Sequence, residues 1–388
     1  MKKILYLLLF GFSIAQAQTS HTGMATYFDG IGAPFGGCGV PESEVETMDY
    51  VALNVFNTPG QGTSYPRPLT GADLSKIGEF QNGNNCGRWL KVTIMENCVG
   101  GTNDGALGQV FCRGAGATWA QDKYFGSQLN MIVTDACGDA NGWCRDSPYH
   151  LDLHTTSLDK FDLNGQKSVG MYPTNFNNRK VKWEYMDAPN YTGDIKIHVM
   201  QGGQRYYAPV LITNLKNGIH KLEQKVNGTW VTAARNGDMG QAFLLPDVNA
   251  PYTIRITDAN DKLVNNGREY TFGFPSSCGS SCTAPSTKVT YTTFTPVVTD
   301  IDENIFGNWN LGVSKNSFNE TEIFLGNIPI ENLTYKIYDL SGKEITNKSI
   351  HSIENNTVSI KMNQSGLYIF HLLSEDKLIS TTKFYEIN

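Results

Sequence analysis

The chain has 388 residues, of which 39 are glycine, 11% are aromatic and only 18% are charged. A chain of this length is typical of two or three domains. Its formal net charge of −6 at pH 7 leaves no basic surplus, so nucleic acid is excluded as an expected partner.

The first 17 residues are typical of a secretory signal peptide. Residues 1–3 (Met-Lys-Lys) are positive, residues 4–14 form an apolar run without charge, and residues 15–17 (Ala-Gln-Ala) form a small-x-small cleavage site. The apolar run is too short to cross a bilayer, and no later stretch is long and apolar enough. The sequence therefore predicts a signal peptide at 1–17, a secreted protein and no membrane span.

Four segments follow in chain order. Residues 21–175 hold most of the glycines, and residues 178–275 lack cysteine and have the length of a β-sandwich domain. Residues 276–304 are rich in Ser, Thr and Pro, which is typical of a linker, and residues 305–388 form a small final β module. We expect the chain to act as a monomer.

Alternation of apolar and polar residues predicts strands along the chain. Residues 89–94 (Trp-Leu-Lys-Val-Thr-Ile) and 252–256 (Tyr-Thr-Ile-Arg-Ile) show the period of two, and clusters of Gly, Asn and Asp separate such runs. Long amphipathic helical repeats are absent from the sequence. The predicted fold class is all-β.

The cysteines indicate disulfides rather than a metal site. An even number in an exported chain predicts pairing, but six cysteines in the first segment allow 15 connectivities and leave the choice open. Cys278 and Cys282 are expected to close a small loop, with an intermolecular bridge as the alternative. The first six lack paired C-x-x-C spacing and a histidine at zinc-finger spacing, so we expect no metal. They are Cys38, Cys86, Cys98, Cys112, Cys137 and Cys144.

Short polar residues interrupt three strand-like runs of the first segment. The runs are residues 23–30 (Gly-Met-Ala-Thr-Tyr-Phe-Asp-Gly), 133–137 (Val-Thr-Asp-Ala-Cys) and 150–153 (His-Leu-Asp-Leu). In a small barrel such residues can converge on one groove.

These three motifs, with residues 86–92 (Cys-Gly-Arg-Trp-Leu-Lys-Val) between them, resemble the expansin family. The resemblance covers roughly residues 21–275. It implies a six-stranded double-psi β-barrel, shared with family-45 endoglucanases, followed by an immunoglobulin-like carbohydrate-binding sandwich. It also implies a protein that binds and loosens cell-wall polysaccharide without cutting it and that needs no cofactor.

The resemblance assigns roles in the groove. Asp152 matches the general acid of the endoglucanases, which expansins need for wall loosening, and Asp135 matches the second acidic position. Thr26 and Tyr27 match residues that line the groove. Residues 27–29 (Tyr-Phe-Asp) resemble the stretch that carries the endoglucanase base, so Asp29 is a candidate second carboxylate opposite Asp152; the alternative is an ordinary turn residue. His150 is expected to be a structural, hydrogen-bonded residue.

Two alternatives to non-hydrolytic loosening stay open. The first is an endo-β-1,4-glucanase with Asp152 as acid and Asp29 as base, since glycoside cleavage needs two carboxyl groups on opposite sides of the bond. The second is a carbohydrate-binding protein with an inactive barrel. The polymer also stays open among cellulose, xyloglucan, another β-glucan and peptidoglycan.

Residues 202–210 (Gly-Gly-Gln-Arg-Tyr-Tyr-Ala-Pro-Val) match a stretch in which expansins carry exposed aromatic residues. The resemblance implies that Tyr206 and Tyr207 stack on sugar rings, which aromatic side chains do at little entropic cost. A regular strand would expose only one of two neighbours, so exposure of both requires a twist or a bulge.

The C-terminal segment resembles the sorting domain of the type IX secretion system. Residues 333–343 contain a strand followed by an Asp-x-x-Gly turn, and residues 364–370 contain Gln-Ser-Gly before another strand. This resemblance implies export across an outer membrane, to the medium or the cell surface.

Overall fold

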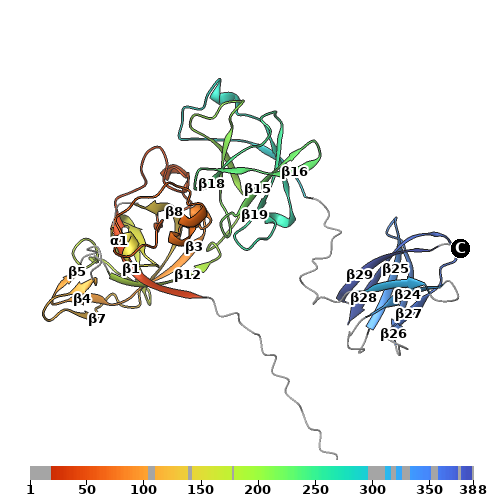
Figure 1. The fold of residues 1–388 in the computed structure, drawn as a ribbon, viewed down its shortest axis with the longest axis horizontal. Helices are drawn as coiled ribbons and strands as arrows, with labels where there is room; N and C mark the ends of the chain where they lie inside the picture. Colours follow the sequence, from red (N-terminus) through yellow and green to blue (C-terminus); the bar gives the residue numbers. More distant parts are fainter. Residues whose placement is uncertain are drawn as a thin grey trace, which may run out of the picture. The chain divides into compact units, whose positions relative to one another are not determined.

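The computed structural model describes residues 19–103, 110–138, 142–176, 179–295, 311–315, 320–325, 333–350, 357–374 and 377–386. They form two compact units that divide after Pro296. Strands predominate in both units, so the predicted all-β class is confirmed (Figure 1). No helix among the described residues has the length and apolarity needed to cross a membrane. The predicted signal peptide, residues 1–17, lies outside the described residues.

Six strands of the first unit close into a barrel. Their order is β8-β2-β9-β1-β12-β3, and β3 pairs back onto β8. The pairs β1–β9 and β2–β8 are parallel. Figure 1 shows β1, in red, running beside β12. The strand bounds are β1 Ser20–Phe28, β2 Tyr50–Asn54, β3 Trp89–Ile94, β8 Gln128–Cys137, β9 Leu151–His154 and β12 Arg179–Met186.

Alternation along these strands separates the barrel interior from its outer face. Val51, Leu53, Leu151 and Leu153 are fully buried in the core cluster of the barrel. Because successive side chains of a strand point to opposite faces, the residues between them face outward. The outward set includes Asp152.

The predicted boundary between the first two domains is wrong by one strand. The predicted second domain, residues 178–275, includes strand β12, but this strand pairs with both β1 and β3. Its apolar residues Val181 and Trp183 are buried in the barrel core. The barrel therefore extends to Met186.

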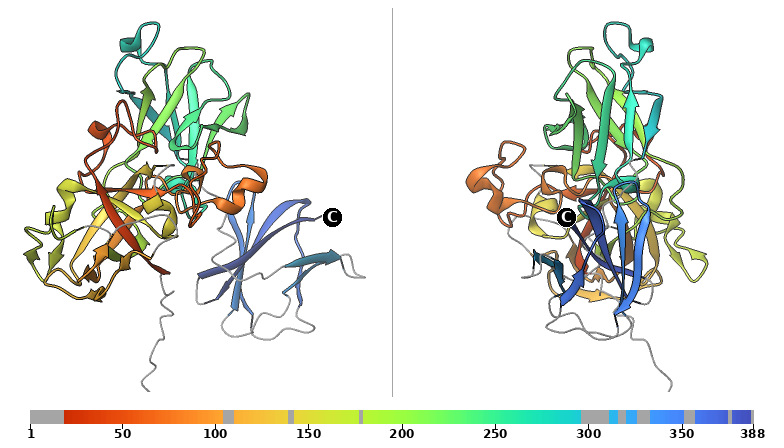
Figure 2. Two further views of the ribbon diagram at one scale, coloured as in Figure 1. Left: turned by 60° about the vertical axis from the view of Figure 1, so that its left-hand side comes forward. Right: turned by 90° about the vertical axis from the view of Figure 1, so that its right-hand side faces the viewer.

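Several short strands and helices are attached to the barrel. Two small sheets, β4–β7 and β5–β6, lie at the end of the barrel away from the sandwich (Figures 1 and 2). β10 and β11 extend the barrel sheet beyond β8. Their bounds are β4 Asn97–Val99, β5 Thr102–Asn103, β6 Cys112–Arg113, β7 Thr118–Ala120, β10 Asp162–Leu163 and β11 Gln166–Lys167. The helices are η1 Glu42–Glu44, η2 Gly71–Lys76, η3 Gln81–Gly83, α1 Gly142–Asp146 and η4 Thr155–Lys160.

All eight cysteines are paired, as predicted. The bridges are Cys38–Cys86, Cys98–Cys112, Cys137–Cys144 and Cys278–Cys282. The last closes the small loop that the sequence predicts, within one chain.

The second part of this unit is a sandwich of two five-stranded antiparallel sheets. The sheet orders are β17-β18-β14-β13-β21 and β16-β15-β19-β20-β22, and a single apolar cluster fills the space between them. The first five bounds are β13 Lys196–Met200, β14 Pro209–Thr213, β15 Lys221–Val226, β16 Thr229–Thr232 and β17 Ala234–Asn236. The others are β18 Met239–Leu244, β19 Tyr252–Thr257, β20 Glu269–Phe272, β21 Ser286–Lys288 and β22 Tyr291–Phe294, with η5 Val264–Asn266 and η6 Ser276–Cys278.

The predicted linker at 276–304 begins too early. Strand β21 pairs with β13 and β22 pairs with β20, so the segment after the cysteine loop completes both sheets of the sandwich. Short strands rich in Ser and Thr suit a sheet edge as well as a linker, and composition alone does not separate the two. Residues 296–304 lie outside the described residues.

The sandwich packs directly on the barrel. Met200, Leu211 and Ala242, on the first sheet of the sandwich, belong to the core cluster of the barrel. The backbone N–H of Gln241 also donates to the carbonyl oxygen of Cys38, at 3.1 Å. Barrel and sandwich therefore form one compact unit.

The second unit contains two antiparallel sheets, β23-β24-β27 and β26-β25-β28-β29, around its own apolar cluster. The predicted hairpin is present between β25 and β26, where the N–H of Asp339 donates to Lys343 and Gly342 has a φ of 81°. The bounds are β23 Gly312–Lys315, β24 Thr321–Phe324, β25 Leu333–Asp339, β26 Glu344–Ile350, β27 Thr357–Ile360, β28 Gly366–Ser374 and β29 Lys377–Glu386.

Candidate functional site

Four neighbouring barrel strands align four small or acidic residues in one row. Thr26 of β1 lies beside Asp152 of β9, Asp152 lies beside Ala52 of β2, and Ala52 lies beside Asp135 of β8. A register shift between Val51 and Ala52 brings Asp135 into the row. With strands about 4.8 Å apart, the two acidic residues are separated by about 10 Å at the backbone. Ala52, between the two acidic residues, is buried in a small cluster with Cys137 and Cys144.

Asp152 is half-buried and held by one hydrogen bond. Its Oδ1 accepts from Thr26 Oγ1 at 2.8 Å, and its Oδ2 lies 3.6 Å from Cys137 Sγ. Burial raises the pKa of Asp152 to about 6; the nearby charge of Asp135 adds to this rise and the Thr26 hydrogen bond opposes it. Asp152 therefore exchanges its proton in mildly acidic solution, which suits a group that donates a proton or a hydrogen bond.

Asp135 is bound to the backbone of a glycine-rich turn. Its Oδ1 accepts from the N–H groups of Gly37 and Ala136, at 2.6 and 2.8 Å. Burial raises its pKa, whereas these two hydrogen bonds and the charge of Arg67 oppose the rise. The turn approaches closely because Gly36 and Gly37 lack Cβ atoms: a Cβ at Gly37 would lie 2.6 Å from that of Ala136.

Thr26 connects Asp152 to a buried histidine. Its Oγ1 lies 2.9 Å from His150 Nε2, and His150 is fully buried. Burial lowers the pKa of His150 to about 3, so the ring is neutral at ordinary pH. The expectation of a hydrogen-bonded histidine agrees with this geometry. The sequence offered no signal for Ala52, whose place in the row follows from strand pairing alone.

The structure does not bring Tyr27 and Asp29 to this row. Tyr27 lies on the opposite face of β1, where its ring packs edge-on against Tyr172 with centroids 5.1 Å apart. Asp29 is exposed at the bend that follows β1. The alternation of a strand explains Tyr27, because a neighbour of Thr26 must point to the other face.

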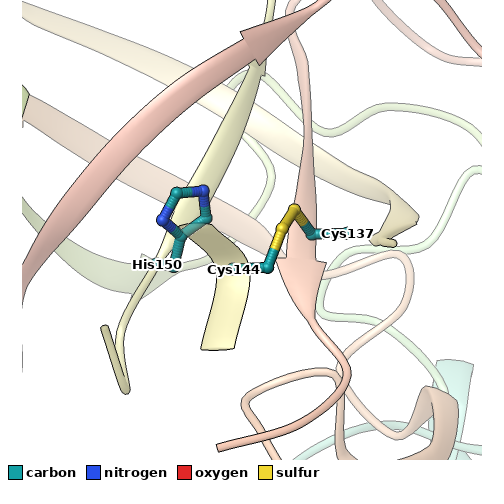
Figure 3. A group of neighbouring side chains, drawn as sticks. All are labelled: Cys137, Cys144 and His150. Atoms are coloured by element: carbon teal, nitrogen blue, oxygen red, sulfur yellow. A yellow bond between two sulfur atoms is a disulfide. The ribbon is translucent and has the colours of Figure 1, made fainter. Parts of the chain in front are cut away.

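A disulfide and His150 lie beside Asp152. Figure 3 shows the bonded sulfur atoms of Cys137 and Cys144 next to the His150 ring. One ligand atom from each of the three residues lies within 4.8 Å of the other two. The sulfur atoms are joined to each other, so they are not thiolates, the form in which cysteine binds a metal. We assign no metal site to this group.

Both candidate tyrosines of the sandwich are exposed. Tyr206 is 73% exposed and Tyr207 is 44% exposed. They lie in a tight turn between β13 and β14, closed by two backbone hydrogen bonds between Gln204 and Tyr207. The turn exposes both rings without the twist or bulge that a strand would need.

The loop closed by the Cys278–Cys282 disulfide supports this turn. Gly202 N–H donates to the carbonyl oxygen of Cys282 at 2.8 Å, and Cys282 N–H donates to that of Gly203 at 2.9 Å. The guanidinium of Arg205 also lies 5.6 Å from the centre of the Phe274 ring. Contacts with Cys282 and Phe274 therefore hold the segment 202–207, here called the tyrosine turn.

Residues 317–386 match the family model of a secretion system C-terminal sorting domain. This match confirms the predicted sorting module and indicates that the chain is exported to the medium or the cell surface. A search of curated proteins gives no match for the chain.

Among solved structures, the chain is similar to the apo form of an expansin from Clavibacter michiganensis and to a mutant of that expansin in complex with cellohexaose. Each comparison has 18% identity and a TM-score of 0.39, and covers 63% of this chain and 89% of the expansin chain. The predicted resemblance to bacterial expansins, with a sorting domain at the C-terminus, is what these comparisons find.

Proposed function

We propose that the first unit binds a cell-wall polysaccharide, cellulose or a related β-glucan, and loosens it without hydrolysis. The observation that carries the proposal is the pair Thr26–Asp152 on the outer face of the barrel, in the motifs that resemble expansins, with the pKa of Asp152 raised to about 6. A protonated carboxyl group both donates and accepts hydrogen bonds. It can therefore exchange partners with sugar hydroxyls that otherwise bind a neighbouring glucan chain.

The tyrosine turn supplies the apolar part of the proposed binding surface. Tyr206 and Tyr207 expose their rings to solvent, and a sugar ring presents a flat face of C–H groups on which an aromatic ring stacks. The hydrogen-bonding row and the stacking rings belong to one compact unit, and the proposal assigns both to the same polymer.

The positions of the other carboxyl groups favour loosening over cleavage. Hydrolysis by inversion needs a second carboxylate that activates water across the groove. Asp29 is exposed beyond the end of β1, and Asp135 has an oxygen bound to two backbone N–H groups. The second candidate function is an endo-β-1,4-glucanase, favoured by the raised pKa of Asp152, with Asp135 rather than Asp29 across the row.

A hydrolysis assay separates the two functions. The mature protein is incubated for a long period with soluble and insoluble β-1,4-glucan, and reducing ends are measured beside Asp152→Asn, Asp135→Asn and Asp29→Ala. We expect no release of reducing ends, co-pelleting with the insoluble polymer, and extension of wall strips that Asp152→Asn abolishes. Sugar release abolished by Asp152→Asn would instead establish a glucanase.

Two sets of variants test whether the protein only binds the polymer. The double variant Tyr206→Ala, Tyr207→Ala is expected to lose co-pelleting, whereas Asp152→Asn keeps co-pelleting and loses wall extension. If Asp152→Asn extends wall strips as well as the unchanged protein does, the barrel is inactive and the protein only binds. Parallel pelleting with cellulose, xyloglucan and peptidoglycan identifies the polymer.

A further inference from the structure

The hydrogen of the Thr26 hydroxyl has one possible destination when Asp152 is ionised. Thr26 Oγ1 lies 2.8 Å from Asp152 Oδ1 and 2.9 Å from His150 Nε2. A hydroxyl has a single hydrogen to donate, and an ionised carboxylate only accepts. Thr26 therefore donates to Asp152, and the contact with His150 requires a hydrogen on Nε2.

The surroundings of His150 are consistent with that tautomer. His150 is fully buried, and within the described part of the chain its Nδ1 has no hydrogen-bond partner. A doubly protonated ring would bury an unpaired N–H together with a charge, which is costly. Burial lowers the pKa of His150 to about 3, in agreement with a neutral ring. The single hydrogen is then on Nε2, facing Thr26.

We infer that His150 is a positioning residue for Asp152: its Nε2–H binds Thr26 Oγ1 and thereby directs the Thr26 hydroxyl onto the Asp152 carboxylate. Hydrogen bonds in a chain polarise one another, so the hydrogen bond from His150 to Thr26 strengthens the hydrogen bond from Thr26 to Asp152. A histidine that only filled space would bear the cost of an unpaired, buried Nδ1, which an apolar residue would avoid.

The other neighbours of Asp152 limit how its titration can respond to a change at His150. Strand β8 contributes the charge of Asp135, β2 contributes the methyl group of Ala52, and the Cys137–Cys144 disulfide covers Oδ2. None of these depends on a hydrogen bond from His150. The disulfide also lies beside His150, within 4.8 Å of a ring nitrogen. A change at His150 can therefore reach Asp152 through Thr26 or through the disulfide, and replacement of Thr26 separates the two routes.

The inference rests on the site of the proposed function, but its test does not use polysaccharide. The full mature chain is titrated and the Asp152 carboxyl is followed by NMR, with Asp152→Asn to assign its signal. His150→Gln places an amide N–H close to the position of Nε2, whereas the shorter Asn of His150→Asn does not reach Thr26. We expect the Asp152 midpoint, near 6 in the unchanged chain, to rise by about one pH unit in His150→Asn and to stay in place in His150→Gln.

His154 provides the matched control. It is buried at the end of β9, and its Nδ1 lies 2.9 Å from the carbonyl oxygen of Met48 rather than near Thr26. His154→Gln is expected to leave the Asp152 midpoint unchanged. In a Thr26→Val background, His150→Asn should have no further effect, because the connecting hydroxyl is gone. An unchanged midpoint in folded His150→Asn, or an equal rise in the Thr26→Val background, would overturn the inference.

A measurement on the unchanged chain remains decisive if the His150 variants fail to fold. Nitrogen NMR of the histidine-labelled full chain reports which ring nitrogen carries hydrogen. We expect His150 to be protonated on Nε2 and bare on Nδ1 from about pH 7 to about pH 8, where Asp152, with its pKa raised to about 6, is ionised. Hydrogen on Nδ1 alone, or on both nitrogens, would refute the inference. The binding and loosening assays can fail without affecting this result.

Discussion

Asp152 couples the proposed activity to stability, because its folded-state pKa is near 6 rather than 3.8. The folded protein holds this proton more tightly than the unfolded chain does. The associated stability is fully present below about pH 3.8 and is lost as the pH rises through about 6. The site therefore keeps a carboxyl group that destabilises the barrel in neutral solution, which is expected of a functional group and not of a structural one.

Asp152→Asn should remove this pH dependence. Asn still accepts a hydrogen bond from Thr26 but has no proton to lose. We expect the variant to raise the free energy of unfolding by up to about 3 kcal/mol near pH 8, and to leave it unchanged near pH 4. Thermal unfolding across this range measures the difference. Asp29→Asn, an exposed carboxyl in the same domain, is the control; a gain of the same size near pH 4 would contradict the explanation.

At this scale the motifs indicate which residues are candidates, and the alternation of side chains along a strand decides which candidates lie together. The motifs identified Asp152, Thr26 and Asp135, which the structure aligns in one row. They also suggested Tyr27 and Asp29, which stand next to the row in sequence. A neighbour on a strand faces the other side, and a residue past the strand end follows no alternation, so neither reaches Asp152.

Among the elements around the site, the glycine turn at residues 36–39 links Asp135 to the sandwich. Gly37 N–H binds Asp135, and the carbonyl oxygen of Cys38 accepts from Gln241 of β18. A side chain at Gly37 would meet Ala136, with its Cβ 2.6 Å from that of Ala136 and 2.9 Å from its backbone nitrogen. The turn has no room to absorb a methyl group.

Gly37→Ala should therefore displace the turn and break the hydrogen bond from Gly37 N–H to Asp135. We expect a loss of about 1–3 kcal/mol in the free energy of unfolding, and a rise in the Asp135 titration midpoint as its carboxylate loses a hydrogen bond. Denaturant unfolding and carboxyl NMR measure the two effects. Gly32→Ala is the matched control from the same loop, since nothing lies within 4 Å of its added Cβ. Equal losses in both variants would mean that the close approach at Gly37 is unimportant.

The sequence predicts which segments form strands and hairpins, but it does not predict as well which sheet each strand joins. Alternation predicted β3 and β19, and the Asp-x-x-Gly pattern predicted the β25–β26 hairpin, because local periodicity and turn chemistry determine these. The placement of β12 in the barrel and of β21 and β22 in the sandwich depends on partners far away in sequence. Composition contains no information on such pairing.

At the scale of the first unit, the barrel and the sandwich meet at a backbone contact too close for side chains. Gly83 of η3 and Gly240 of β18 lie against each other, and a Cβ added at Gly240 would lie 1.8 Å from the Gly83 carbonyl oxygen. An ion pair at 2.7 Å between Arg67 and Asp238 flanks this contact. The proposed function requires both parts, since the row with Asp152 is on the barrel and the tyrosine turn is on the sandwich.

Gly240→Ala should loosen this junction while leaving each part folded. The methyl group cannot be absorbed by a flexible side chain, because the atom it meets is backbone. We expect about 1–3 kcal/mol of destabilisation of the first unit, and a split of the calorimetric transition of that unit into two. Co-pelleting through the tyrosine turn should persist, and wall extension should fall, because the stacking rings no longer hold the polymer against Asp152. Gly273→Ala, where nothing lies within 4 Å, is the sandwich control. Full wall extension by a Gly240→Ala protein with two separate transitions would show that the barrel acts without the sandwich, and would remove the tyrosine turn from the mechanism.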